Sequence, residues 1–225
     1  MGTQEGVRPA FYALRRGGWR DYVTLLHPPY TAWHLSYVAI GAALAPHFQL
    51  DRLLWALLAF FLAMGVAAHA LDELKGRPLK TAIPGPVLVA LAAISLSGSV
   101  AIGIGASVAW GYGLLAFVAI GAIAVPAYNL ELAFHTYPGF ALLWGALPAL
   151  TGYFVEAQTL SFEALAVALF AFATSAAQRT LSTPVRRARR EHLTIEGIGA
   201  LENALRLIAL SLVALAVALV AARLR

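Results

Sequence analysis

Eight ionisable side chains interrupt the apolar segments of this chain, and their types suit chemistry. They are His34, His69, Asp72, Glu73, Glu131, His135, Glu202 and Arg206. A charge in hydrocarbon costs roughly 2.5–3.5 kcal/mol on the lenient insertion scales, so such residues usually face one another or a wet cavity. If the apolar segments cross a membrane in alternating directions, all eight side chains fall at the same face. The pattern therefore predicts one shared site.

The spacing of these residues favours metal binding. His69, Asp72 and Glu73 stand at i, i+3 and i+4 and share a helix face, and Glu131 and His135 are four residues apart. Imidazoles with several carboxylates form the ligand set for Zn, Mn or Fe, and helix bundles build such sites from facing side chains. The predicted ligands are His34, His69, Asp72, Glu73, Glu131, His135 and Glu202. The alternative is a network of buried ion pairs that only holds helix ends together.

A basic loop, Lys75–Lys80, directly follows the first carboxylates. Carboxylates that hold a divalent cation, with Lys and Arg beside them, suit a phosphate or diphosphate. Arg179 ends an apolar run and is expected to point into the same cavity, whereas the four arginines of 186–190 read as ordinary membrane-side anchors. The predicted substrate contacts are Lys75, Arg77, Tyr128, Trp144, Gln178 and Arg179. The two aromatic residues would contact hydrocarbon or stabilise a cation.

The elements that must position these residues are membrane spans. A mean hydropathy of +0.75, with 60% hydrophobic and 12% charged residues, excludes an ordinary soluble domain. We predict an all-α bundle of about seven spans, because most apolar runs approach the ~20 residues that cross a bilayer. The runs are Tyr30–Phe48, Leu53–Leu74, Val87–Ala109, Tyr112–Leu132, Phe140–Val155, Ala164–Ala177 and Ala200–Ala221. The fifth and sixth are short, and a merged pair would give six spans.

The distribution of basic residues predicts the orientation. With alternating spans, thirteen Lys and Arg residues fall on the N-terminal side and three on the other. This bias places the N-terminus and the site on the cytoplasmic side of the cytoplasmic membrane. Residues 1–29 lack the apolar core of a signal peptide and read as an interfacial segment, and residues 30–225 form the transmembrane domain. The net charge of +5 is attributed to lipid headgroups and not to nucleic acid.

Two further sequence patterns indicate where one helix begins and how the helices pack. Thr183 and Pro184 read as an N-cap and first-turn proline that open a separate basic helix over Val185–His192. Small residues recur on several helices and predict close packing of backbones, in a monomer or a dimer. These residues are Gly41/Ala45, Gly98/Ile102/Gly105 and Gly145/Ala149/Gly152.

Over residues ~25–215 the chain resembles the UbiA superfamily of intramembrane prenyltransferases. The stretch Gly41–Ala45 resembles that family's opening helix, and the end of the second run with Arg77-Pro78-Leu79 resembles its first acidic motif. Tyr128–Gly152 is similar to its fourth and fifth helices. The resemblance implies a divalent metal, Mg²⁺, that holds a prenyl diphosphate, with Asp72, Glu73 and Glu131 as catalytic carboxylates.

The chain also departs from this pattern. His69 stands where the family has Asn, and the second acidic motif is replaced by Gln178–Thr183, which has no carboxylate. Imidazole in the ligand set moves the preference from Mg²⁺ towards Fe, Mn or Zn. We therefore expect a metal-dependent enzyme acting on an isoprenoid or related lipid. The alternatives are a transition-metal lipid oxidase or hydrolase, and a non-catalytic lipid-binding or assembly protein.

Overall fold

The chain is helical throughout the part that the structure describes. The structure is a computed structural model that describes residues 8–191, 193 and 196–225. These residues form α-helices and two π-helical segments, with no β-strand among them. In chain order the elements are α1 (Trp19–Leu25), α2 (Pro28–Leu44), α3 (Leu50–Phe60), η1 (Phe61–Ala68), α4 (His69–Gly76), α5 (Gly85–Trp110), α6 (Leu114–Asn129), α7 (Tyr137–Ala141), η2 (Leu142–Ala146), α8 (Leu147–Ala157), α9 (Phe162–Glu191) and α10 (Ile198–Arg223). The predicted all-α class is confirmed.

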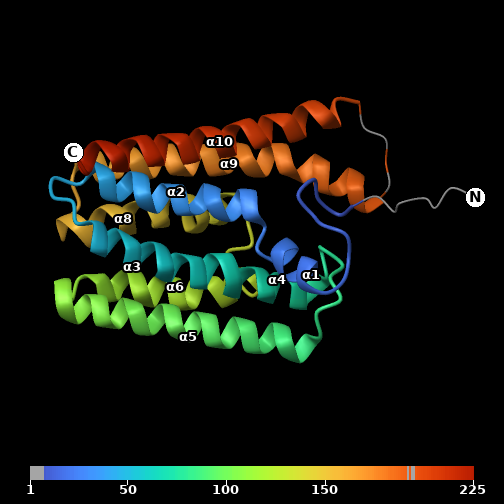
Figure 1. Ribbon diagram of the computed structural model, residues 1–225, viewed down its shortest axis with the longest axis horizontal. Coiled ribbons are helices and arrows are strands. Elements are labelled where there is room, and N and C mark those ends of the chain that lie inside the picture. The colour runs from blue at the N-terminus through green and yellow to red at the C-terminus, as the bar shows by residue number, and fades with distance from the viewer. Residues whose placement is uncertain (1–7, 192, 194–195) are drawn as a thin grey trace, which may run out of the picture.

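Several of these elements join into long rods that lie side by side (Figure 1). Five helical segments of the described chain are long and apolar enough to cross a membrane. They are Leu50–Gly76, Gly85–Trp110, Tyr137–Ala157, Phe162–Glu191 and Ile198–Arg223. The shorter apolar helices α2 and α6 run alongside them. The chain is therefore a helical membrane protein.

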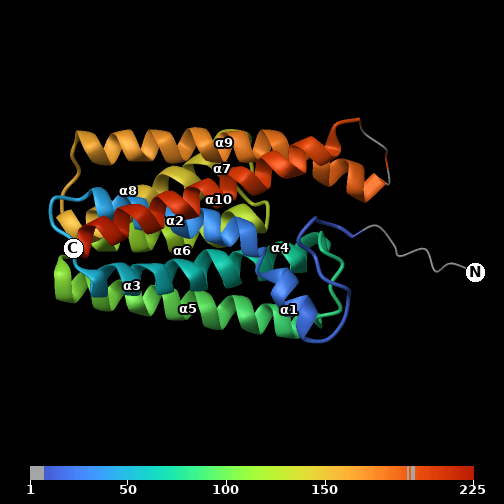
Figure 2. The ribbon, with the colours of Figure 1, turned by 45° about the horizontal axis from the view of Figure 1, so that its top comes forward.

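Helix α2 lies at the centre of the bundle, packed against α8 and α10 (Figures 1 and 2). Trp33 and Tyr37 are fully buried, and the Trp33 indole N–H donates to the Tyr37 hydroxyl. That hydroxyl lies 2.6 Å from the Thr174 hydroxyl and accepts a hydrogen bond of 3.1 Å from Ser175 in α9. This network gives the polar atoms of these core side chains hydrogen-bond partners, which is necessary where water is excluded.

Glycine allows α2 and α8 to approach closely. A Cβ added to Gly41 would overlap the carbonyl of Ala149, and one added to Gly152 would overlap the carbonyl of Val38. The predicted role of small residues is confirmed at these positions. It is wrong at Gly105, because a Cβ there would meet nothing within 4 Å.

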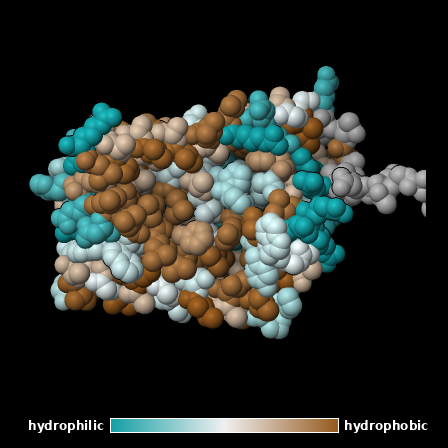
Figure 3. Space-filling model, in the orientation of Figure 1, coloured by the Kyte–Doolittle hydropathy of each residue, from teal (hydrophilic) through white to brown (hydrophobic). Residues whose placement is uncertain are grey.

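The outer surface matches the surroundings of a membrane protein. Many large apolar side chains of α5 and α10 are exposed, among them Ile94, Val108 and Leu210. In Figure 3 hydrophobic residues cover the middle of the visible face and hydrophilic residues gather towards its two ends. Lipid hydrocarbon is the environment that such a band requires.

Helix α9 differs from its predicted form. The apolar run was expected to stop near Ala177, with a new helix from Val185, but one continuous helix covers both and contains Pro184. The Thr183 hydroxyl donates to the carbonyl of Arg179 at 2.6 Å, so it bonds within the helix and caps nothing. The predicted separate helix is therefore wrong as far as residue 191, and His192 lies outside the described residues. The other predicted runs match helices to within a few residues.

Candidate functional site

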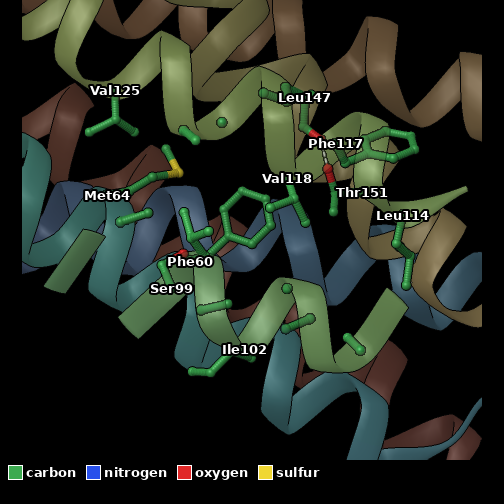
Figure 4. Close-up of a pocket in the computed structure, with 18 of the residues that line it drawn as sticks. Phe60, Met64, Ser99, Ile102, Leu114, Phe117, Val118, Val125, Leu147 and Thr151 are labelled. Atoms are coloured by element: carbon green, nitrogen blue, oxygen red, sulfur yellow. Dashed lines mark hydrogen bonds between the residues drawn. The ribbon is translucent and has the colours of Figure 1, made fainter. Parts of the chain in front are cut away.

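An apolar cavity lies between α3–η1, α5, α6 and η2–α8 (Figure 4). Its space is about 900 Å³, part of which opens to the surroundings. Its wall includes Phe60, Met64 and Val118, with few polar atoms. The hydroxyl of Thr151 donates to the Leu147 carbonyl of its own helix at 2.8 Å, so its hydrogen is already used. The cavity therefore suits a hydrocarbon chain.

Both π-helical segments border this cavity. Met64 belongs to η1 and Trp144 to η2, and both pack in one cluster with Val125 of α6. A π-helical turn widens a helix locally and occurs frequently at functional sites. Neither segment is indicated by the sequence pattern, because hydrophobic periodicity does not separate a π-helical turn from an α-helical one.

A polar pocket opens at the end of the bundle where α4 ends. Its space is about 790 Å³, including open solvent at its mouth. It is lined by Asp72, Lys75, Gly76, Arg77, Pro78, Lys80, Glu131 and Arg190. Four of these residues carry a positive charge and two carry a carboxylate, so the pocket favours an anion such as a phosphate.

The two pockets border the same two rods. Met64 of the apolar cavity precedes Asp72 of the polar pocket by eight residues, a helical rise of roughly 12 Å. Val125 of the cavity is near the end of α6, and Glu131 of the polar pocket follows that end directly. One extended amphipathic molecule could therefore occupy both pockets along these rods.

Glu73 shapes the basic loop that lines the polar pocket. Its side chain is fully buried, and one carboxylate oxygen accepts a hydrogen bond of 2.9 Å from the Leu79 N–H. The other oxygen accepts 2.8 Å bonds from the N–H and the hydroxyl of Thr81. Arg77 adds a 2.6 Å bond to the Ile83 carbonyl. Glu73 therefore directs both oxygens into the loop, whereas its neighbour Asp72 lines the pocket.

Aromatic side chains gather beside the apolar cavity, whose wall includes Trp144. The Tyr128 ring stacks on His135 at 4.6 Å between centroids and packs against Trp144 at 4.3 Å. Arg179 donates to the Tyr128 hydroxyl, and its guanidinium lies 5.4 Å from the Phe140 ring centroid. Four predicted site residues, namely Tyr128, His135, Trp144 and Arg179, are thus brought together, through packing and cation–π contacts.

The two other histidines of the predicted ligand set, His34 and His69, do not line the polar pocket. His69 stacks on His27 at 4.0 Å between centroids, and its Nδ1 lies 3.0 Å from the Gly65 carbonyl oxygen. His34 is buried against Phe140, with its Nδ1 lacking a hydrogen-bond partner. Gln178, predicted as a substrate contact, is likewise buried, with its Oε1 unpartnered. Neither His34 nor Gln178 lines the pockets described above.

The last two residues of the predicted set serve the packing of α10. Glu202 accepts a 2.6 Å bond from the Arg189 guanidinium, and Arg206 lies 4.8 Å from the Phe11 ring centroid. Within residues 8–191, 193 and 196–225, no three His, Asp or Glu side chains are grouped to hold a metal ion. The predicted convergence is thus replaced by several smaller groups, of which Asp72, Lys75, Arg77 and Glu131 share the polar pocket.

The N-terminal segment closes over this end of the bundle. Tyr12 packs on the rings of Tyr30 and His27, at 5.5 and 5.3 Å between centroids. Burial raises the pKa of Tyr12. Burial also lowers the pKa of His27, and the charges of His69 and Arg186 lower it further. Both groups are therefore expected to be neutral near pH 7. Residues 1–7 of the predicted segment lie outside the described residues.

Two cations that line the polar pocket, Lys80 and Arg190, are not among the predicted site residues. Lys80 belongs to the basic loop that the sequence singled out, and its place in the loop was the available signal. Arg190 also lines the pocket, although it was interpreted as a membrane-side anchor. Its position depends on α9 continuing through Pro184, which the sequence pattern did not predict.

No family model, no curated protein and no solved structure matches the chain. The site is therefore interpreted from its own residues.

Proposed function

We propose that the chain binds, within the membrane, a lipid that has an anionic phosphate-bearing head and a long hydrocarbon tail. The substrate class that fits best is an isoprenoid diphosphate, and the reaction class is prenyl transfer of the UbiA type. The head would occupy the polar pocket and the tail would extend into the apolar cavity. The basic end of the bundle would face the cytoplasm, with α2 and α6 as two further spans beside the five long ones.

The observation that carries this proposal is the alignment of the two pockets along the same helices. A pocket with four cations lies at the end of the rods whose middle parts line the hydrocarbon-like cavity. Such a combination discriminates against both simple anions and simple hydrocarbons, because each would fill only one pocket.

A divalent cation is compatible with the polar pocket. Asp72 and Glu131 are the carboxylates that line it, and together with phosphate oxygens they offer the hard oxygen ligands that Mg²⁺ prefers. When bound, such an ion would neutralise charge that develops on a departing diphosphate. In this proposal Glu73 is a positioning residue and acts through the loop.

A second candidate function is lipid binding without catalysis. The engagement of both Glu73 oxygens by loop donors favours it, because one of the three predicted catalytic carboxylates is already used. Both candidate functions predict that the lipid binds, but only the transferase also predicts turnover.

Binding is tested first, with farnesyl diphosphate as the probe and the detergent-solubilised full chain as the protein. Gly121→Leu fills the apolar cavity, because Gly121 lines it and a Cβ there meets nothing within 4 Å. We expect farnesyl diphosphate to bind at least about tenfold more weakly to this variant, since buried methylenes contribute about 0.8 kcal/mol each. Gly105→Leu is the matched control, because Gly105 is equally open but does not line the cavity.

Equal affinities of Gly121→Leu and Gly105→Leu for farnesyl diphosphate would contradict the placement of the tail in the apolar cavity. Release of diphosphate from bound farnesyl diphosphate, measured with and without Mg²⁺, then separates the two functions. Release with transfer of the prenyl group to a nucleophilic acceptor supports the transferase. Tight binding with no release supports the lipid-binding protein.

A further inference from the structure

The four arginines at the end of α9 differ in their partners. Arg187 pairs with Glu191 at 3.2 Å, and Arg189 bonds to Glu202 of α10 at 2.6 Å. Arg186 and Arg190 have no ion-pair partner among the described residues. These two arginines are four residues apart, so they project from the same side of the helix. The two paired arginines therefore stabilise the helix ends, and the two unpaired ones are free to bind something else.

One of the two unpaired arginines lies at the polar pocket. Arg190 lines it directly. Arg186 is exposed and lies one helical turn before Arg190 on the same side of α9. The basic loop faces the same space from α4 with Lys75 and Lys80. Cations thus approach the pocket from two helices that are far apart in the sequence.

The charge balance of the pocket is unfavourable without a ligand. The cations Lys75, Arg77, Lys80 and Arg190 outnumber the carboxylates of Asp72 and Glu131. Like charges repel, and an anion with several oxygens between the two sides would relieve this repulsion. Arginine suits the task because its planar fork binds phosphate oxygens in pairs.

We infer that Arg186 and Arg190 are head-group residues, and that they and the basic loop hold a diphosphate directly, without needing a divalent cation. This inference rests on the proposed function, because it concerns the head of the same ligand. It gives α9 the role of an arginine arm opposite the loop. A metal ion, where present, then assists an anion that the protein already holds.

Inorganic diphosphate is the probe that tests the arm separately from the tail. Binding to the full-length chain in detergent is measured by calorimetry in EDTA and again in Mg²⁺. Wild type is expected to bind in EDTA. Arg190→Ala and Arg186→Ala are each expected to weaken binding about tenfold, the loss typical of one charged hydrogen bond. The affinity of Arg190→Lys for diphosphate should lie between those of wild type and Arg190→Ala, because lysine keeps the positive charge but lacks the planar guanidinium.

Arg187→Ala is the control, because it removes an exposed arginine of the same helix that already pairs with Glu191 and does not line the polar pocket. Thermal unfolding of each variant excludes a general loss of fold. Two results would overturn the inference: equal binding by the Arg187→Ala, Arg186→Ala and Arg190→Ala variants, or loss of wild-type binding in EDTA.

The proposed function fails by a different result. Suppose that Arg190→Ala weakens the binding of inorganic diphosphate, but wild type binds farnesyl diphosphate no more tightly than inorganic diphosphate. The role of the arginine arm is then supported and the lipid assignment is overturned. If farnesyl diphosphate binds tightly and is weakened by Gly121→Leu but by neither Arg186→Ala nor Arg190→Ala, the lipid assignment stands and the arm is overturned. If neither probe binds, both proposals are overturned.

Discussion

At the scale of single residues, two adjacent carboxylates have opposite surroundings. Glu73 is fully buried and accepts three hydrogen bonds from the basic loop, whereas Asp72 lines the polar pocket. A carboxylate that accepts several N–H and O–H bonds stabilises the backbone that donates them. Glu73 is therefore expected to control the shape of the loop, and Asp72 the charge of the pocket.

The first prediction separates these roles by substitution. Glu73→Gln places an amide N–H against donors of Leu79 and Thr81, so we expect a loss of about 3 kcal/mol in the free energy of unfolding. Asp72→Asn should leave this free energy nearly unchanged. In EDTA, Asp72→Asn should strengthen the binding of inorganic diphosphate, because it removes from the pocket a negative charge that repels this anion. Thermal unfolding and calorimetry measure the two effects, and equal destabilisation by both variants would count against the assignment.

The second prediction concerns acidification. The folded-state pKa of His27 lies below its usual value, mainly because of burial, so the unfolded chain binds a proton more readily. The stabilising effect of neutral His27 is present above the unfolded pKa of about 6.5 and is lost as the pH falls below it. We expect the unfolding temperature to drop between about pH 7.5 and about pH 5.5. His27→Gln should show a smaller drop, and an identical pH profile would exclude His27 as a cause.

Residue types predicted part of the site and could not predict which partner each residue has. Asp72, Lys75 and Arg77 were predicted from the acidic motif and the basic loop, and all three line one pocket. Glu202 was also singled out, yet it pairs with Arg189, because an interhelical ion pair depends on the angle between α9 and α10. That angle arises from packing over the whole bundle, which local spacing does not encode.

At the scale of elements, the length of the apolar runs predicted the rods, because a membrane-spanning segment must satisfy its own backbone groups and therefore forms a helix. It failed at α9, where polar residues after Gln178 suggested an end. The rod continues although Pro184 removes one backbone N–H from the helix, because one face of the helix stays buried at Val185 and Ala188. The two π-helical segments were missed for a different reason, since both lie within apolar sequence and leave its character unchanged.

The third prediction concerns the contact between α2 and α8. Gly152→Ala would force a methyl group into the Val38 carbonyl, so we expect a loss of about 2 kcal/mol or more in the free energy of unfolding. Gly105→Ala provides the control, because a methyl group there meets nothing within 4 Å and alanine favours the helix. Thermal unfolding of both variants in the same detergent compares them. A Gly152→Ala variant as stable as Gly105→Ala would mean that the helices can separate without cost.

At the scale of the whole molecule, the polar end is assembled from distant parts of the chain. Asp21 accepts a 2.8 Å bond from the Ala82 N–H and thereby joins the N-terminal segment to the basic loop. Arg189 donates to the Arg8 carbonyl at 3.0 Å, and Arg206 contacts Phe11. The segment thus connects the loop on α4 with the arginine-bearing ends of α9 and α10.

The fourth prediction follows from this connection. Asp21 is buried, and its carboxylate also accepts a 2.9 Å bond from the Gly17 N–H, so Asp21→Ala leaves two backbone donors without partners. We expect trypsin to cut faster at the exposed Arg15, Arg16 and Arg20, and inorganic diphosphate to bind more weakly because the loop loses an anchor. Asp51→Ala is the control, since Asp51 is exposed at the opposite end of the bundle. Faster cleavage with unchanged diphosphate binding would show that the segment covers this end of the bundle without shaping the pocket.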